Sequence, residues 1–359
     1  MKFYYIALVF YLISCLSCSL DKSENDFEVP FKQLDSFIND VHTLKVNIDE
    51  IPITEIGIDD KNIIYYLDED IDSLSYLSSI TKTKNGFVFY DSGLKKLYNL
   101  SGDGAKINSF ANEGRGPGEI NGVRHIDENS KHIYISDSGN RRINIYDQQL
   151  NFLRSESEIF STQFNVNDKF LVSENSTHSG VENLISVKPI DGFNVTKSTL
   201  VPRLVPLGYQ PTALNGTHFS INDDNKLVVA YSAIPWMFIF DEQFVLKQTL
   251  VFSKSSFDTL DTWQLEIEKA EIGKSYFGRN PITNISILNN EAVIVGVRNE
   301  LIILSKNGSD IYEPVKRLVF KLQSKSINQK YFGIYNEVIG SDGEKIFVHN
   351  YNYLFWVNL

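Results

Sequence analysis

Short apolar segments alternate with polar turns along most of this chain, and two of them recur in register. Phe87-Val88-Phe89-Tyr90 is followed by Asp91-Ser92-Gly93, then by two lysines and a new apolar segment. Residues 133–135 lead to Asp137-Ser138-Gly139, then to two arginines and a new apolar segment, and Asp137 follows Asp91 by 46 residues. Short runs of aromatic and β-branched residues bounded by turn residues predict β-strands.

Four further copies of this unit follow the same plan. Their apolar segments lie at 169–173, at 227–231 with 237–240, at 293–295 with 301–304, and at 346–349 with 353–357. Turns rich in Asn, Asp or Gly precede most copies, and these residues tolerate the positive φ that tight hairpins require. Each unit is therefore predicted as strand, turn, strand, turn, strand, with a fourth strand where an apolar segment such as Phe152-Leu153 comes next.

The spacing of the units predicts an all-β, six-bladed β-propeller over residues 41–359. Four strands in about 40–50 residues is the size of a propeller blade, and Asp241 follows Asp147 by 94 residues, close to two such units. A β-sandwich, the alternative fold, would not explain the constant spacing. Residues 44–48 alternate in strand fashion, and we expect this N-terminal strand to complete the last blade and close the ring.

One interval between units exceeds the repeat. Val293 follows Leu227 by 66 residues, and the surplus falls on residues 258–273. Asp258 can cap a helix and Gly273 can end it. An apolar face between them is formed by Leu260, Trp263, Ile267 and Ala270. We predict one short helical insertion between blades 4 and 5, which either shields a blade edge or covers the ring as a lid.

The first residues predict export. Lys2 precedes an apolar run, residues 3–13, which is too short to span a bilayer and matches the apolar region of a signal peptide. Small residues and two cysteines follow, as in a lipobox. We predict a lipoprotein signal peptide over residues 1–17, acylation of Cys18 with Cys15 as the alternative, and a tether or linker over residues 18–40. The mature protein would be lipid-anchored in the cell envelope, with the outer membrane as the expected location; an ordinary secretory signal is the other interpretation.

Composition narrows the range of partners. The formal net charge is −11, and an anionic chain without a Lys/Arg tract repels phosphate backbones, so no nucleic-acid partner is expected. Both cysteines lie within the first 18 residues, so the predicted propeller has neither a disulfide nor a thiol site.

A glycine-rich segment, Gly114-Arg115-Gly116-Pro117-Gly118-Glu119-Ile120, separates the first two units. A Gly-x-Gly-Pro-Gly-Glu loop followed by such a strand unit resembles the bacterial six-bladed β-propeller lipoproteins with NHL-like blades, although Ile120 replaces their usual aromatic residue. The resemblance implies fold and export and no particular activity. The loop could cradle an anion on its backbone amides, but it lacks the lysine of a P-loop, and a tight inter-blade turn explains its composition better.

Local motifs give little support for catalysis. The six histidines form no His-x-His or His-Glu-x-x-His pair, and no Gly-x-Ser-x-Gly elbow occurs. His125 lies near the start of a predicted innermost strand, where some propellers hold an axial metal. We predict no cofactor, and calcium or zinc would be the ions expected if the axis held a metal.

A candidate binding surface follows from the strand order. In an up-and-down blade, the turn between the second and third strands lies on the same face as the inter-blade loops. We expect one rim of the ring to carry Lys95, Arg115, Arg142, Trp236, Arg298 and Tyr351. Cations and aromatic rings on one face suit acidic sugars or peptides; for Trp236, packing between blades is the alternative.

These observations favour a non-enzymatic binding or scaffolding propeller that presents this rim to a glycan, a peptide or an outer-membrane partner. The alternative is a metal-dependent enzyme, lactonase-like or lyase-like, that uses the axial channel. Acidic and histidine side chains converging from the innermost strands would favour that alternative.

Overall fold

The structure is a computed structural model. It describes residues 32–39, 41–66, 77–104, 107–157, 161–175, 182–193, 195–204, 215–254, 281–289, 291–297, 299–323, 336–342, 345–350 and 353–359. The predicted signal peptide with Cys15 and Cys18, and the predicted helical insertion at 258–273, lie outside these residues. Within them, no helix combines the length and the apolar character needed to cross a membrane.

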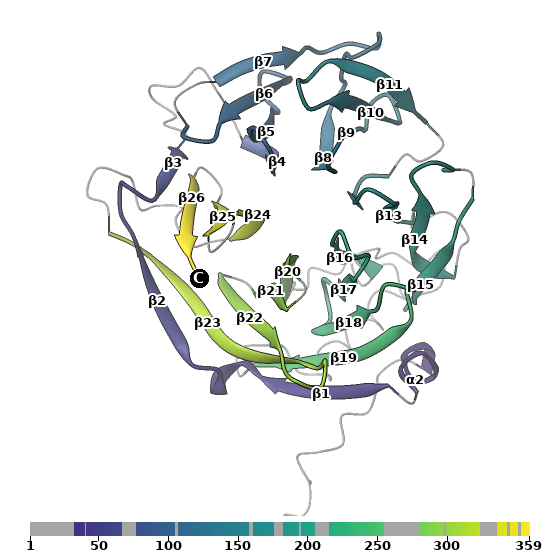
Figure 1. The fold of residues 1–359 in the computed structure, drawn as a ribbon, viewed down its shortest axis with the longest axis vertical. Coiled ribbons are helices and arrows are strands. Elements are labelled where there is room, and N and C mark those ends of the chain that lie inside the picture. Colours follow the sequence, from purple (N-terminus) through teal and green to yellow (C-terminus); the bar gives the residue numbers. More distant parts are fainter. Residues whose placement is uncertain are drawn as a thin grey trace, which may run out of the picture.

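Six sheets surround a common axis, which confirms the six-bladed propeller (Figure 1). In each blade the strands follow one another outward from the axis. Blade 1 contains β4 (Leu77–Thr83), β5 (Gly86–Asp91), β6 (Lys96–Ser101) and β7 (Ile107–Ala111); blade 2 contains β8 (Val123–Glu128), β9 (His132–Asp137), β10 (Arg142–Asp147) and β11 (Phe152–Glu156); blade 3 contains β12 (Phe164–Val166), β13 (Phe170–Glu174), β14 (Asn183–Pro189) and β15 (Ser198–Pro202).

The second half of the ring repeats this plan. Blade 4 contains β16 (Thr217–Ile221), β17 (Leu227–Tyr231), β18 (Trp236–Phe240) and β19 (Leu246–Ser253); blade 5 contains β20 (Ile282–Asn289), β21 (Ala292–Val297), β22 (Glu300–Lys306) and β23 (Tyr312–Leu322); blade 6 contains β24 (Glu337–Asp342), β25 (Lys345–Asn350) and β26 (Tyr353–Asn358). The apolar segments that define the predicted units all lie on second or third strands of these blades.

The N-terminal segment supplies outer strands to three successive blades. It contains α2 (Lys32–Ile38), β1 (His42–Asn47), the 3₁₀ turn η1 (Ile48–Glu50), β2 (Ile53–Ile58) and β3 (Ile63–Tyr66). Strand β1 pairs in parallel with β19 of blade 4, β2 pairs in parallel with β23 of blade 5, and β3 pairs antiparallel with β26. Figure 1 shows β1 and β2 running along the outside of the ring.

An N-terminal strand therefore completes the last blade, as predicted, but its identity differs from our prediction. The closing strand is β3, whereas residues 44–47 belong to β1 and pair with β19. The alternation that predicted a strand at 44–48 reflects burial of Val46 and Ile48 against Phe252 of blade 4. A strand pattern specifies which face is buried and not which sheet edge the strand joins.

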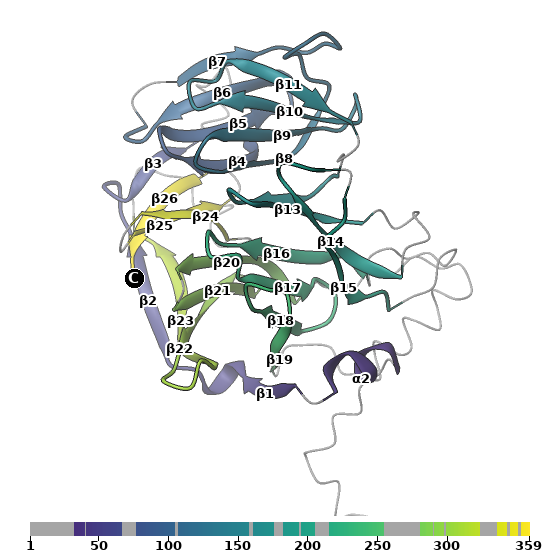
Figure 2. The same cartoon turned by 45° about the vertical axis from the view of Figure 1, so that its right-hand side comes forward.

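Among the described residues, six clusters of buried hydrophobic side chains fill the six interfaces between neighbouring blades. Helix α2, at the end of the predicted linker 18–40, packs on one of them, and the ring of Phe37 lies 5.3 Å from that of Phe238. Figure 2 shows α2 at the edge of blade 4, next to β1. The last part of that linker is thus docked on the propeller.

Candidate functional site

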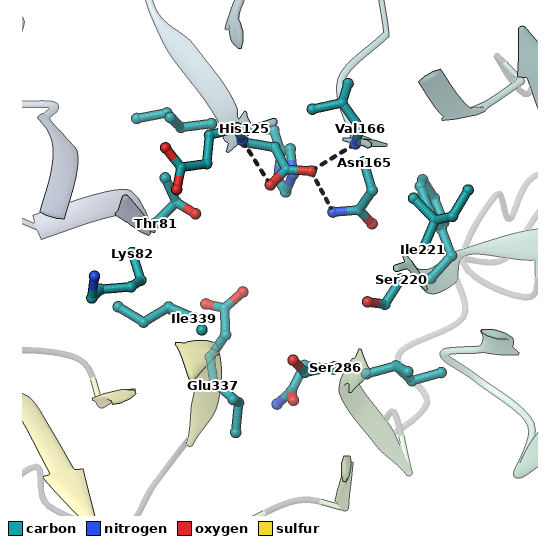
Figure 3. A pocket seen from close by; sticks show the side chains of 18 of the residues that line it. Thr81, Lys82, His125, Asn165, Val166, Ser220, Ile221, Ser286, Glu337 and Ile339 are labelled. Atoms are coloured by element: carbon teal, nitrogen blue, oxygen red, sulfur yellow. Dashed lines mark hydrogen bonds between the residues drawn. The ribbon is translucent and has the colours of Figure 1, made fainter. Parts of the chain in front are cut away.

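A cavity of about 280 Å³ lies on the axis, enclosed by the innermost strand of every blade (Figure 3). Its size is at the lower end of that of small-molecule sites, about 300–1,000 Å³. Its polar lining consists of Thr81, Lys82, His125, Asp127, Glu128, Gln163, Asn165, His218, Ser220, Asp223, Asn284, Ser286 and Glu337. The site therefore draws on all six blades.

Strand alternation explains how polar groups come to line the cavity. In β8, His125 and Asp127 flank Ile126, which is buried between blades, and in β16, His218 and Ser220 flank the buried Phe219. Since successive side chains point to opposite faces of a strand, the apolar positions pack on a neighbouring blade and the polar ones are left to the cavity.

The carboxylate of Asp127 joins blade 2 to blade 3. Its Oδ2 accepts hydrogen bonds from the backbone N–H of Val166 (2.8 Å) and from Asn165 Nδ2 (3.0 Å), and its Oδ1 accepts one from the Glu128 N–H (2.9 Å). Figure 3 shows these bonds. Burial nevertheless raises the pKa of Asp127 above its usual value. The carboxylate is held in a fixed position beside the cavity.

Two histidines line the cavity as neutral imidazoles. Burial lowers the pKa of His218 to about 4, and it also lowers the pKa of His125. Each ring is hydrogen-bonded to a backbone group of the next blade, at Phe164 for His125 and at Ile282 for His218. The Nε2 atom of His125 has no hydrogen-bond partner in the described part of the chain, so this nitrogen can serve a ligand.

Glu337, at the start of β24, directs its carboxylate into the cavity, as Figure 3 shows. Its side chain is 41 % exposed, and Oε2 lies 3.9 Å from His349 Nδ1. Burial alone would raise the pKa of Glu337, but its hydrogen bond with His349 is the largest of several opposing interactions, and together they lower that pKa. Glu337 is therefore an ionised group facing the cavity.

Glu128, the last residue of β8, differs from Glu337. Burial raises its pKa to about 7, despite a hydrogen bond from Gln148 Nε2 (3.3 Å) and the charge of Lys82. A carboxyl with a pKa near neutrality can either donate or accept a proton at physiological pH.

No group of three or more His, Cys, Asp or Glu side chains is placed to share a metal ion within the described ranges. These residues therefore offer no set of metal ligands to support the metal-dependent enzyme hypothesis. The convergence that would favour an axial enzyme is present: three carboxylates and two histidines of innermost strands line one cavity.

The predicted rim lies at the other end of the ring from most of this lining. Lys95, Arg142 and Trp236 lie at turns between second and third strands, whereas the cavity reaches the ends of β8, β12 and β16 and the exposed Asp223 in the turn after β16. Arg298 and Tyr351 lie outside the described residues.

Two of the predicted rim cations that the structure describes form ion pairs within the protein, and the third is exposed. Lys95 Nζ pairs with Glu113 at 2.7 Å, and Arg115 is exposed. Arg142 Nε pairs with the buried Asp137 at 3.0 Å, and its Nη2 donates to the carbonyls of Gly116 and Glu119, both at 2.8 Å. Arg142 therefore fixes the glycine-rich loop.

Trp236 is 2 % exposed and belongs to the cluster between blades 3 and 4. The packing interpretation explains this indole, because so small an exposed area leaves it almost no surface for a ligand. A ligand-binding role for this rim stays a prediction.

The glycine-rich loop is a closed inter-blade turn. The Gly114 N–H donates to the Ile120 carbonyl (2.8 Å), and the Gly116 N–H donates to the Glu119 carboxylate (2.7 Å). A Cβ on Gly114 would lie 2.0 Å from Glu119 Oε2, and Gly118 has a φ of +73°. The left-handed φ favours glycine at position 118, and a side chain at position 114 would displace the Glu119 carboxylate. The amides of Gly114 and Gly116, which an anion could use, are bonded within the loop itself.

Comparisons with known proteins support the fold of this chain and do not identify its function. No protein-family model matches the sequence, and no curated protein matches it. An exported protein of Bacteroides fragilis has the same fold, with 13 % identity and a TM-score of 0.56 over 88 % of this chain and 99 % of that chain.

Two other solved structures are more distant. A DUF4221-family protein of Bacteroides vulgatus is 12 % identical, with a TM-score of 0.47 over 84 % of this chain and 98 % of that one. Virginiamycin B lyase of Staphylococcus aureus, solved with quinupristin, is 11 % identical, with a TM-score of 0.45 over 80 % and 82 %.

Of the residues that line the cavity, His125 is the one that the sequence pattern singles out. Asp127 and Glu128 lie further along the same strand, β8. Polar residues in alternation on the first strand of each unit, as in His218-Phe219-Ser220, were the available signal. Those strands are less apolar than the second and third strands, so the repeat pattern does not draw attention to them.

Proposed function

We propose that this protein is an exported, lipid-anchored binding propeller of the cell envelope, of the NHL-like lipoprotein class, and that its ligand enters the axial cavity. The observation that carries the proposed site is the convergence of polar side chains from all six innermost strands on one cavity. The acidic and histidine members of this lining also favour catalysis there, which is the second candidate below. A cavity of about 280 Å³ suits a single small unit, such as one sugar of a glycan or one side chain of a peptide.

Preorganisation supports binding at this site. Asp127 is fixed by three donors, and Ser220 Oγ accepts a hydrogen bond from the Ile287 N–H (3.2 Å), which joins blades 4 and 5. A ligand would therefore meet side chains that are already ordered, which lowers the entropic cost of binding.

Occlusion of the cavity tests the proposal. We expect Ser286→Phe, on innermost strand β20, to fill the cavity and abolish binding of a glycan or peptide found by screening the mature protein. The matched control is Arg115→Ala on the exposed rim, which should bind normally. Retained binding in Ser286→Phe together with loss in Arg115→Ala, measured by calorimetry, would move the site to the rim.

Catalysis in the same cavity is the second candidate. It is favoured by Glu128, whose pKa of about 7 suits a general acid or base, beside the fixed carboxylate of Asp127. An enzyme should convert the ligand identified above and lose turnover in Glu128→Gln while still binding it. Unchanged ligand after prolonged incubation with the wild-type protein would leave the binding function alone.

The lipid anchor has its own test. We expect the mature protein to partition into detergent and to carry acyl chains on Cys18, as read by mass spectrometry of the N-terminal peptide. Cys18→Ser should make it water-soluble, and Cys15→Ser should not. The reverse result would assign the anchor to Cys15, and a soluble wild-type protein would support an ordinary secretory signal.

A further inference from the structure

The charges of the axial cavity are unbalanced. Four carboxylates line it, those of Asp127, Glu128, Asp223 and Glu337, against a single lysine, Lys82. Within the described residues, no Lys or Arg nitrogen lies within 4.0 Å of any of these carboxylates, and the nearest ion-pair partner is His349, 3.9 Å from Glu337. Asp223 is exposed and Glu337 is 41 % exposed, so these carboxylates face the water of the cavity without a neighbouring cation.

Lys82 acts on Glu128 through its charge but forms no ion pair within 4.0 Å of a carboxylate in the described part of the chain. Its Nζ donates a hydrogen bond to the backbone carbonyl of Thr83, and it lies 5.7 Å and 5.5 Å from the ring centroids of Phe87 and Phe347. The ammonium group is thus committed to a carbonyl and two aromatic faces, where a cation is stabilised.

The uncharged part of the lining offers hydrogen-bond acceptors. Asn284 is 5 % exposed, its Nδ2 donates to the Asn336 carbonyl at 2.6 Å, and its Oδ1 has no partner among the described residues. Asn165 Oδ1 and His125 Nε2 are also buried atoms without a hydrogen-bond partner among the described residues. Buried polar atoms normally have partners, so these acceptors call for a ligand rich in N–H groups.

From this arrangement we infer that the ligand of the axial cavity is an organic cation, bearing an ammonium group that pairs with Glu337 and donates to neighbouring acceptors. The inference rests on the proposed function, because it assumes that the cavity is the binding site. An amino sugar or a lysine side chain has this chemistry, whereas an anionic sugar would bring a like charge to Glu337.

A matched pair of probes tests the inference. D-glucosamine carries an ammonium group where D-glucose has a hydroxyl. In the same way, 1,4-diaminobutane carries ammonium groups where 1,4-butanediol has its two hydroxyls. Each is titrated into the mature protein, and the NMR signals of the His125 and His218 imidazoles report occupancy of the cavity. We expect each amine to bind at least about tenfold more tightly than its neutral partner, the effect of one charge-assisted hydrogen bond.

Variants assign the preference to the cavity. Glu337→Gln keeps the shape of the side chain and removes its charge, so it should abolish the preference for amines. Glu55→Gln changes net charge equally at an exposed ion pair on outer strand β2, and it should leave the preference unchanged. If Glu337→Gln fails to fold, Ser286→Lys provides a second route, because a cation on β20 should exclude the amines.

The outcomes separate the two hypotheses. Amine preference that is lost in Glu337→Gln and kept in Glu55→Gln supports the inference. Equal binding of charged and neutral partners, or tighter binding of D-galacturonate, overturns the inference and leaves cavity binding intact. If no probe perturbs either histidine, the inference fails. The proposed function fails with it only if the glycan or peptide found by screening also leaves both histidines unperturbed.

Discussion

Buried aspartates have two roles in this propeller, and the role depends on which strand carries them. Asp91 and Asp137 end second strands, where Asp91 Oδ1 accepts from the N–H groups of Gly93 and Leu94, and Asp137 Oδ1 accepts from that of Asn121. Asp127 lies on a first strand and joins two blades beside the cavity. The repeated Asp-Ser-Gly motif therefore marks a structural turn, and the aspartate outside the motif is the one at the candidate site.

Arg142 should behave as a structural residue. Arg142→Ala removes the cation beside Asp137, whose side chain is fully buried, and three hydrogen bonds to the glycine-rich loop. We expect a loss of about 3 kcal/mol in the free energy of unfolding, because a buried charge is left without its partner. Urea denaturation measures it. Arg154→Ala, which breaks an exposed pair with Glu156, should cost less than about 1 kcal/mol, and equal losses would contradict this account.

Glu128 should make stability depend on pH. Its folded-state pKa, about 7, lies above the value of 4.5 for an unperturbed side chain. The protonated form is therefore favoured by folding, and this contribution is complete below pH 4.5 and lost as the pH rises to 7. Glu128→Gln mimics the protonated form, so it should exceed the wild type in stability at pH 8 by about 1–2 kcal/mol, a value reduced because the side chain is partly exposed to solvent, and match it near pH 4.5. Denaturant titrations at both pH values check this, and a variant no more stable at pH 8 would contradict it.

At the scale of the element, the sequence predicts second and third strands well and first strands poorly. Strand β9 is apolar at Ile133, Tyr134 and Ile135 because both of its faces pack between blades, and it repeats β5 in register. Strand β8 alternates between cavity and core, and its polar positions carry the site. A repeat search finds the elements that hold the ring together, and the cavity is built from the strands that depart from the repeat.

Partners of a strand are harder to predict than the strand itself. Residues 44–47 and 63–66 both lie in short strands, yet the first joins blade 4 and the second completes blade 6. The choice depends on the path of the chain around the ring, which local alternation does not encode. For the same reason, Trp236 was open to two interpretations until its position between blades was known.

At the scale of the whole molecule, the N-terminal segment pairs with blades that are far from it in sequence. Residues 32–66 contact blades 3 and 4 through α2, and then pair with blades 4, 5 and 6 in order. Ring closure depends on β3 alone, because β1 and β2 add a fifth strand to blades that already have four. The cavity needs a closed ring, since its lining includes blade 1 and blade 6.

This difference predicts unequal effects of shortening the chain. A protein that begins at residue 52 loses α2, β1 and the buried Leu34, Val46 and Ile48, at a cost of roughly 5 kcal/mol, but it keeps β3 and should still unfold in one cooperative transition. A protein that begins at residue 68 also loses β2 and β3, and the loss of β3 leaves β26 as an unpaired edge and opens the ring between blades 6 and 1. It should unfold without a sharp transition and aggregate through that edge. Calorimetry and size-exclusion chromatography distinguish the two, and a cooperative, monomeric chain from residue 68 would show that the ring closes without its N-terminal strand.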